Sequence, residues 1–289
     1  MQAFTYVSPK TIGEAAAILA TEGDNAKILS GGTDIIVQLR EGRRQAKVVV
    51  DVKAIPELNT LTFDAQKGLT VGSAVPCHKI YGDAAIAKAY PGLMDSVTLI
   101  GGAAIQGRAT LGGNVCTASP AGDSLPSLIA LGAVCMVMGK SVTKEIPIEK
   151  MFAGPGKTVL QPGELLVAIR IPAPKPNSGA AYLRFIPRNE MDIAVVGAGV
   201  SVELDASKTK FVAARISIGA VAPTPLLVAE AGAALLGQSV GDAVINQAAE
   251  LAKAAARPIS DMRGTAEQRK HLTAVMTRRA LEIAIARAR

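Results

Sequence analysis

The segment 109–131, ATLGGNVCTASPAGDSLPSLIAL, constrains the fold of this chain more than any other feature. It combines two adjacent glycines with an amide, several hydroxyl groups and one acid, and an apolar helix-like run starts near Pro126. Glycines let a flat or charged ligand approach the backbone closely, and the polar side chains supply hydrogen bonds. The sequence therefore predicts a ligand-binding loop. The alternative interpretation is an irregular surface loop in which Asp123 caps the following helix.

A second glycine turn, LSGGTD at 29–34, follows a strand-like KIL and precedes an apolar block from Ile35 to Leu39. Backbone N–H groups of a tight turn at a helix start can cradle an anion. Thr33 adds a hydroxyl donor, whereas Asp34 would be repelled by phosphate and suits a cap or a bond to a ribose or backbone group. A plain glycine turn explains this segment equally well when it is taken alone. Two such loops in one chain favour an extended dinucleotide.

The two familiar nucleotide-binding motifs do not fit this sequence. Six residues separate Gly132 from Gly139 before Lys140-Ser141, where a P-loop needs four, and the run is strand-like. Gly197 and Gly199 lie within a predicted strand without the third glycine of a Rossmann fingerprint, so we expect them to be packing sites. A dinucleotide would have to be held in another way.

The order of predicted elements indicates a mixed fold. The first 55 residues predict a β-α-β unit, because Thr11 and Glu14 form a capping-box pattern and KVVVDV at 47–52 is a β-branched buried strand. Short strands flank the glycine-rich centre: LTVG, VCMVM and ELLVAIRI. Beyond the proline-rich PAPKPNSG, DIAVVGAGVSVEL and ARISIGAV alternate like antiparallel strands. Two helices follow, at about 241–256 and at 265–287, where Thr265 and Gln268 form the cap.

Composition narrows the function classes. With 289 residues and 49% hydrophobic residues, the chain can bury a sizeable core in two or three lobes, and no apolar stretch is long enough to span a membrane. We expect a cytoplasmic protein. Three scattered cysteines and two isolated histidines provide no metal site on this chain. The net charge of +7 is compatible with nucleic-acid binding, but Trp is absent and aromatic residues make up 3% of the chain. An anionic cofactor or acidic partners explain the charge at least as well.

The chain resembles the FAD-binding medium subunits of xanthine dehydrogenase, carbon monoxide dehydrogenase and related molybdenum hydroxylases. Five segments in the same order carry the resemblance, over nearly the whole chain: YVSPKTIGEAAAIL, ILSGGTDII, TLGGNVCTASPAGDSLPSLIAL, RFIPRNEMDIAVVGAGVSV and RPISDMRGTAEQRKHLTAVMTRRAL. The resemblance implies an α+β fold. Its parts would be a two-lobed FAD-binding unit similar to the vanillyl-alcohol-oxidase (PCMH) type, with lobes at 1–56 and 57–174, and a C-terminal domain at 175–289 with an antiparallel sheet and helices.

The resemblance also implies which residues contact FAD. The turn from Leu29 to Ile35 would bind the diphosphate, Asp123 would hold ribityl or ribose hydroxyls, and Leu166 and Arg184 would lie near the isoalloxazine edge. Arg184 replaces a lysine that is frequent in related proteins, and Ile100 stands where animal xanthine dehydrogenases have an aromatic over the flavin. The full set of implied cofactor-binding residues is Leu29, Ser30, Gly31, Gly32, Thr33, Asp34, Ile35, Ile100, Thr110, Gly113, Asn114, Thr117, Asp123, Leu166 and Arg184.

The function that the resemblance implies is electron relay without a catalytic side chain. A large subunit would hold the molybdenum cofactor, a small subunit would hold 2Fe-2S clusters, and FAD on this chain would pass their electrons to an external acceptor. The resemblance suggests a dimer of such heterotrimers. The residues themselves leave two alternatives open: a free-standing flavin oxidase or reductase, and a basic scaffold protein that has lost FAD. The sequence leaves the substrate and the electron acceptor undecided.

Overall fold

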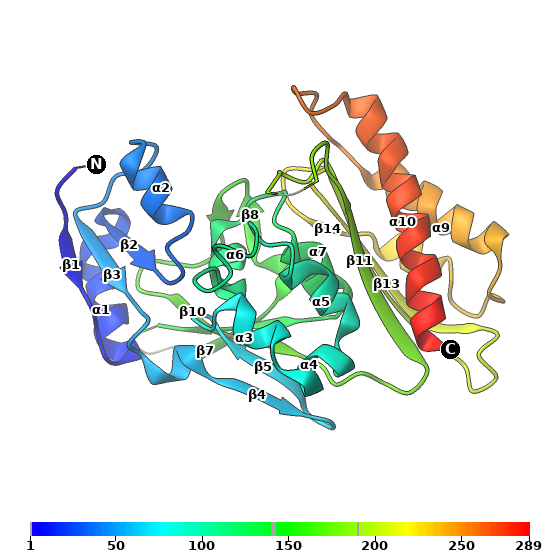
Figure 1. Ribbon diagram of the computed structural model, residues 1–289, viewed down its shortest axis with the longest axis horizontal. Helices are drawn as coiled ribbons and strands as arrows, with labels where there is room; N and C mark the ends of the chain where they lie inside the picture. Colours follow the sequence, from blue (N-terminus) through cyan, green and yellow to red (C-terminus); the bar gives the residue numbers. More distant parts are fainter. Residues whose placement is uncertain (1, 140–142, 190) are drawn as a thin grey trace.

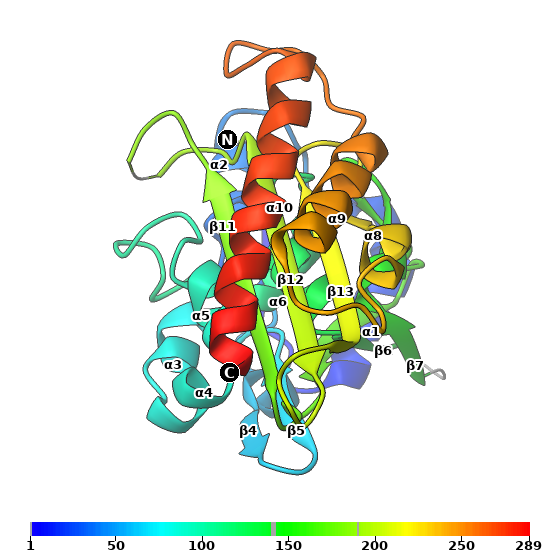
Figure 2. The ribbon, with the colours of Figure 1, turned by 90° about the vertical axis from the view of Figure 1, so that its right-hand side faces the viewer.

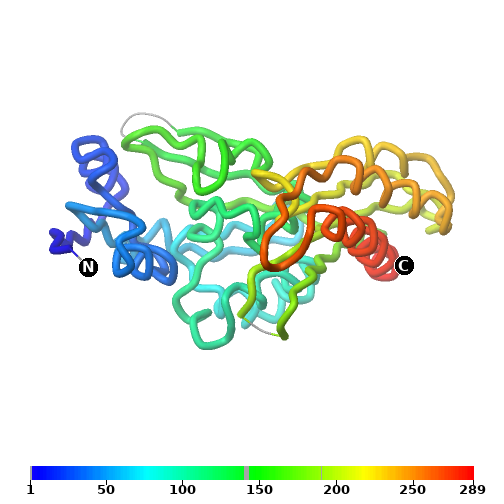
Figure 3. The backbone as a smooth tube through the Cα atoms, turned by 90° about the horizontal axis from the view of Figure 1, so that it is seen from above, coloured from blue at the N-terminus to red at the C-terminus, as the bar shows by residue number. Residues whose placement is uncertain are grey.

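The computed structural model describes residues 2–139, 143–189 and 191–289. Lys140 and Ser141 of the excluded P-loop and Glu190 of the fourth resembling segment lie outside these ranges. Within them, three main β-sheets follow one another along the longest axis of the molecule (Figure 1). Seen from above, the chain starts at one end of this axis, and its last helix lies in the opposite half (Figure 3).

The first sheet is small and parallel, and the first glycine turn directly follows its strand β2. Helix α1 (Ile12–Glu22) begins at Thr11, whose hydroxyl accepts the N–H of Glu14, and buries Ile12, Ala15, Ala16 and Leu19. The predicted β-α-β unit is therefore confirmed. Its strands lie in the order β1-β3-β2, with the short helix α2 (Ile35–Arg40) after the turn: β1 (Thr5–Val7), β2 (Ala26–Leu29) and β3 (Val48–Asp51).

The second sheet is antiparallel and contributes to one of the two large core clusters of the described residues. Its order is β4-β5-β10-β6-β7, and β8 and β9 form a separate hairpin. The strands are β4 (Leu61–Asp64), β5 (Gly68–Gly72), β6 (Val134–Met138), β7 (Thr143–Pro147), β8 (Phe152–Gly154), β9 (Lys157–Thr158) and β10 (Leu165–Ile171). The helices that accompany it are α3 (Cys77–Tyr81), α4 (Ala84–Ala89), α5 (Pro91–Val97), α6 (Leu111–Thr117) and α7 (Ser124–Ala130).

The third sheet is antiparallel in the order β11-β12-β13-β14. The long helices α9 and α10 cover one of its faces (Figure 2), and α5 and α7 pack on the other. A Cβ on Gly199 would lie 2.8 Å from the Ser127 nitrogen, so this glycine lets α7 approach the sheet, as expected of a packing site. The elements are β11 (Ser178–Phe185), β12 (Val196–Leu204), β13 (Phe211–Gly219), β14 (Leu226–Leu227), α8 (Ala229–Ala233), α9 (Asp242–Ala255) and α10 (Ala266–Ala288).

Three sequence expectations need correction at their boundaries. Helix α7 starts at Ser124 rather than near Pro126. Strand β12 starts at Val196, because residues 192–195 precede the strand although their apolar run resembles one. The helices between 77 and 97 were not anticipated, since each is only five to seven residues long and too short to display a helical period. Among the described residues, no helix is both long and apolar enough to cross a membrane.

Candidate functional site

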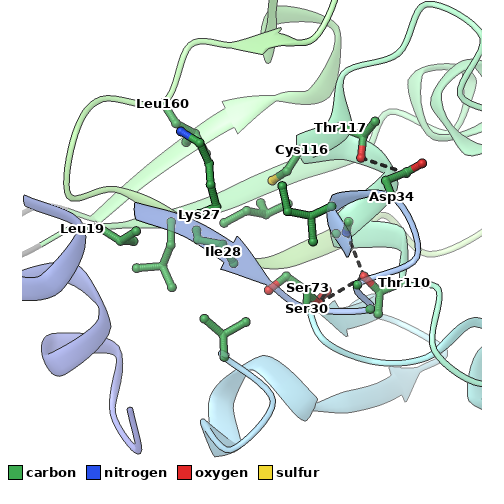
Figure 4. A pocket seen from close by; sticks show the side chains of 18 of the residues that line it. Leu19, Lys27, Ile28, Ser30, Asp34, Ser73, Thr110, Cys116, Thr117 and Leu160 are labelled. Atoms are coloured by element: carbon green, nitrogen blue, oxygen red, sulfur yellow. Dashed lines mark hydrogen bonds between the residues drawn. The ribbon is translucent and has the colours of Figure 1, made fainter. Parts of the chain in front are cut away.

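A cavity of about 380 Å³ lies between the first and second sheets (Figure 4). Both glycine turns contribute to its walls, together with part of β2 and the segment before β10. Its lining includes twelve of the fifteen residues expected to bind cofactor: Ser30, Gly31, Gly32, Thr33, Asp34, Ile35, Ile100, Thr110, Gly113, Asn114, Thr117 and Leu166. The fold thus brings together two motifs that are far apart in the sequence.

The first glycine turn presents its backbone donors to this cavity. Within the described ranges, no protein group accepts a hydrogen bond from the backbone N–H groups of residues 31–35. Gly32 has φ +85°, a conformation that side chains with a Cβ rarely adopt. Gly31 lies so close to the second turn that a Cβ on it would collide with the Arg108 carbonyl oxygen and lie 3.1 Å from Ala109 Cα. The turn is therefore shaped to offer several N–H groups to one anionic ligand.

The second glycine segment forms the start of helix α6. Thr110 caps this helix by accepting the N–H of Gly113 at 2.8 Å. Gly112 packs against Ser73, whose Cα would lie 2.5 Å from an added Cβ. The Gly112 N–H has no acceptor among the residues that the structure describes, and Gly112 lines the cavity. This segment therefore adds a further backbone donor opposite the first turn.

Hydrogen bonds connect the two turns around the cavity. Ser30 Oγ lies 3.3 Å from Thr110 Oγ1 and donates to the Ser73 carbonyl oxygen at 3.2 Å. Arg108 Nε donates to the Gly31 carbonyl oxygen at 3.2 Å. These contacts fix the separation of the two backbone cradles, which is the geometry that an extended ligand with two polar halves requires.

Asp34 does not cap helix α2, contrary to one sequence expectation. It occupies the N-cap position, but its backbone is already helical and its carboxylate makes no cap hydrogen bond. Instead, Thr117 Oγ1 donates to Asp34 Oδ2 at 3.2 Å across the cavity (Figure 4). The carboxylate is thereby directed toward α6 and away from the N–H groups of its own turn.

Three expected residues lie outside the cavity lining. Leu29 packs with Leu39, Ala46 and Val49 behind the turn. Asp123 accepts from Tyr182 Oη at 3.0 Å and from Arg184 Nη1 at 2.9 Å. Its carboxylate therefore bonds to strand β11, and the alternative of a capping role is wrong because Asp123 makes no cap hydrogen bond to α7.

Burial dominates the electrostatics of this acid. It raises the pKa of Asp123, and the Arg184 charge and the hydrogen bonds from Arg184 and Tyr182 oppose the rise. Burial and the neighbouring Asp123 charge also raise the pKa of Tyr182 well above its ordinary value, so Tyr182 stays a neutral donor. Arg184 Nη1 lies 3.5 Å from the Leu99 carbonyl oxygen, next to the cavity residue Ile100.

Sequence reasoning missed several residues at one end of the cavity. Lys27, Arg44 and Cys116 line it, as does the segment 160–165. Strand period does not single out Lys27, because its neighbours Ala26 and Ile28 in β2 line the cavity as well, and nothing local indicates that Arg44 reaches the cavity. Its Nη2 would lie 3.7 Å from a Cβ on Gly156 in the β8–β9 turn. The lining thus carries the cations Lys27 and Arg44 together with the acids Asp24 and Glu164.

Taken together, the unpaired backbone donors and the size of the cavity suit an extended anionic ligand of the dinucleotide class. Comparison with known proteins gives the family. Residues 2–174 match the FAD binding domain in molybdopterin dehydrogenase, and residues 181–284 match the CO dehydrogenase flavoprotein C-terminal domain.

Relatives extend the match to the full length. A carbon monoxide dehydrogenase medium chain of Afipia carboxidovorans is 33% identical over 287 residues, which cover 99% of this chain and 98% of the relative. A xanthine dehydrogenase FAD-binding subunit of Escherichia coli O157:H7 is 29% identical, covering 98% and 97%. A chain in the structure of reconstituted CO dehydrogenase from Oligotropha carboxidovorans superposes with a TM-score of 0.94 at 32% identity, covering 99% of both chains.

The chain belongs to the family of FAD-binding subunits of molybdopterin dehydrogenases, the CO dehydrogenase and xanthine dehydrogenase group. It is a flavoprotein subunit of an oxidoreductase, and the expected α+β fold is confirmed. The alternatives of a free-standing oxidase and of a FAD-less scaffold therefore give way to this assignment.

The residues of the cavity fit FAD by their chemistry. Unpaired N–H groups at residues 31–35 and at Gly112 suit diphosphate oxygens, and the side chains of Leu19 and Ile28 line the cavity with apolar surface that suits a flat ring. A Cβ on Gly31 would disturb the contact between the two walls, and a Cβ on Gly112 would disturb the packing of α6 on Ser73.

Proposed function

We propose that this chain is the flavin subunit of a three-component molybdenum hydroxylase. When bound, FAD would supply the redox chemistry by taking electrons from 2Fe-2S clusters and giving them to an external acceptor. The molybdenum cofactor would lie on a large subunit and the clusters on a small one, with two heterotrimers forming a dimer. The relatives called medium chain of carbon monoxide dehydrogenase support this division of labour.

The unpaired backbone donors of the two glycine turns carry the assignment of the binding site. In this assignment the turn 30–35 and Gly112 hold the diphosphate, while Thr110, Gly113, Asn114 and Thr117 lie toward the flavin. Ile100 and Leu166 provide apolar walls at the flavin end. No side chain of this chain has to act as an acid, base or nucleophile, because the substrate is oxidised on another subunit.

In this proposal, Asp123 and Arg184 support the site without contacting FAD. Their ion pair supports the loop at Leu99 and Ile100, because Arg184 also lies next to the Leu99 carbonyl oxygen. The lobes at 1–56 and 57–174 would supply the two walls of the site, and the domain at 175–289 would close the back of the second lobe.

A titration of the purified full chain with FAD tests the cofactor assignment. Flavin fluorescence should report saturable one-to-one binding of FAD, with FMN much weaker, since FMN lacks the diphosphate and adenosine half. The same titration on the chain co-expressed with the large and small subunits of its own complex covers the case in which partners complete the site. Failure of both preparations to bind FAD would overturn the proposal.

Rapid-mixing absorbance spectroscopy tests the electron path. In the assembled complex, reducing substrate should bleach the flavin band, and removal of the cluster-bearing subunit should abolish that bleaching while FAD stays bound. Flavin reduction that persists without the cluster subunit would contradict the relay. Light scattering on the intact complex would then test the dimer of heterotrimers.

A further inference from the structure

Asn114 and Ser124 make a hydrogen-bonded pair at the edge of the cavity. Asn114 is the fourth residue of α6 and lines the cavity, whereas Ser124 is the first residue of α7 and is fully buried. Ser124 Oγ lies 2.7 Å from Asn114 Oδ1, and the Ser124 backbone nitrogen lies 3.4 Å from the same oxygen. The pair therefore joins a cavity residue to a residue that no ligand can touch.

This pair determines which way the carboxamide of Asn114 points. A backbone N–H can only donate, so the amide atom that faces the Ser124 nitrogen must be the oxygen. The Nδ2 group then lies on the other side of the amide. Within the described ranges, no protein atom accepts a hydrogen bond from Nδ2. The side chain consequently has two N–H donors available for a ligand in the cavity.

The position of Ser124 is itself set from outside the cavity. Its neighbour Asp123 is held by two side chains of strand β11, Tyr182 and Arg184. On the other side, Gly122 leaves room for the amide, because a Cβ on it would lie only 3.1 Å from Asn114 Oδ1. The third sheet thus fixes residues 122–124, and these residues fix the carboxamide.

We propose that Ser124 is a positioning residue for FAD, which orients the Asn114 carboxamide so that Nδ2 donates to an oxygen of the bound cofactor. The inference rests on the proposed cofactor site and adds a residue to it that does not contact FAD. Without the Ser124 hydroxyl, the amide can rotate and present its oxygen to FAD, which exchanges a donor for an acceptor at that point.

Ser124→Ala tests the proposal in the full chain, with Ser127→Ala as matched control. Ser127 is a buried serine in the same helix, and its hydroxyl donates to the Gly92 carbonyl oxygen at 2.8 Å, away from the cavity. Ser124→Ala should raise the Kd for FAD about threefold to tenfold, the range for loss of one hydrogen bond. Ser127→Ala should leave the Kd unchanged, and Ser124→Thr, which keeps the hydroxyl, should restore it.

A double-mutant cycle separates positioning from a structural effect on the helix. If Ser124 acts through the amide, then Ser124→Ala should have no further effect on the Kd in an Asn114→Ala chain. An equal loss of affinity in both backgrounds would overturn the proposal, as would an unchanged Kd for Ser124→Ala alone. If Asn114→Ala keeps full affinity, both the inference about Ser124 and the assignment of Asn114 to the FAD site are wrong. A wild-type chain that never binds FAD would instead overturn the proposed function itself.

Discussion

Arg184 on strand β11 lies 2.9 Å from Asp123, and the two side chains are only 8% and 12% exposed. Arg184 belongs to the third sheet, whereas Asp123 is the residue just before α7 begins. Because the pair is nearly withdrawn from water, its two members depend on each other: either one alone would be an uncompensated buried charge.

Arg184→Met should therefore destabilise the chain by about 3–5 kcal/mol at neutral pH. The loss should be smaller in acid. Burial has already raised the pKa of Asp123 above its ordinary 3.8, and Arg184 opposes that rise, so its removal raises the pKa further. A raised carboxyl pKa contributes stability that is present below 3.8 and lost as the pH rises through the folded-state pKa. Urea denaturation at a series of pH values should show the deficit of Arg184→Met growing as the pH rises through the folded-state pKa of Asp123, which lies above 3.8.

Arg170→Met is the matched control for this prediction. Arg170 pairs with Glu145 on the surface, with side chains 45% and 52% exposed. Its removal should cost at most about 1 kcal/mol. A deficit for Arg184→Met that is independent of pH would show that the guanidinium acts by packing rather than by charge.

Gly31→Ala should weaken FAD binding by more than about tenfold, because the added Cβ would separate the two turns by colliding with the Arg108 carbonyl oxygen. Gly32→Val should abolish binding, since a branched side chain disfavours the +85° φ of this turn. Isothermal titration calorimetry with FAD measures both. Gly13→Ala in α1, where no atom lies within 4 Å of the new Cβ, should bind FAD as the wild type does. Full affinity of the Gly31→Ala variant for FAD would show that this turn is not part of the binding site.

Arg44→Met should lower the affinity for FAD about tenfold or more, the effect of losing a charge-assisted hydrogen bond to an anionic ligand. Arg44 lines the cavity, whereas its neighbour Arg43 is 65% exposed and pairs with Glu41 outside it. Arg43→Met is therefore the control and should leave the Kd unchanged. Equal effects of the two variants would point to long-range attraction rather than to contact, and a Kd measured at high salt would reveal it.

Cys116 should be the first thiol to react with N-ethylmaleimide in the FAD-free chain. Burial raises the pKa of all three thiols to about 12, so access rather than acidity sets the order of reaction. Cys116 is an exposed residue that lines the cavity, whereas Cys77 and Cys135 are fully buried. Saturating FAD should protect Cys116, and peptide mass spectrometry would identify the modified residue. Labelling at an unchanged rate with FAD bound would place the cofactor elsewhere.

Local sequence patterns predicted much of the fold, but they did not predict the contacts between residues that are far apart in the sequence. Thr11 and Thr265 begin helices as their capping patterns indicate, because a cap and its partner lie within one turn. The bond between Thr117 and Asp34 joins residues 83 positions apart, and no local pattern encodes such a pairing. For the same reason, the sequence could suggest that Asp123 and Arg184 matter but could not show that they bind each other.

The contact of Gly31 with the backbone at Arg108 joins the two walls of the cofactor cavity, so binding of the cofactor affects the stability of the protein in the cell. The walls of the cavity belong to separate sheets, but they also share a buried apolar cluster that includes Val50 of β3 and Leu165 of β10. The two walls therefore stay together in the folded chain, and FAD adds its binding free energy to a site that is already formed. By mass action, FAD should raise the thermal stability of the chain in proportion to the logarithm of its concentration. A cell short of riboflavin would then hold this subunit in a less stable and more degradable form, before any electron is transferred.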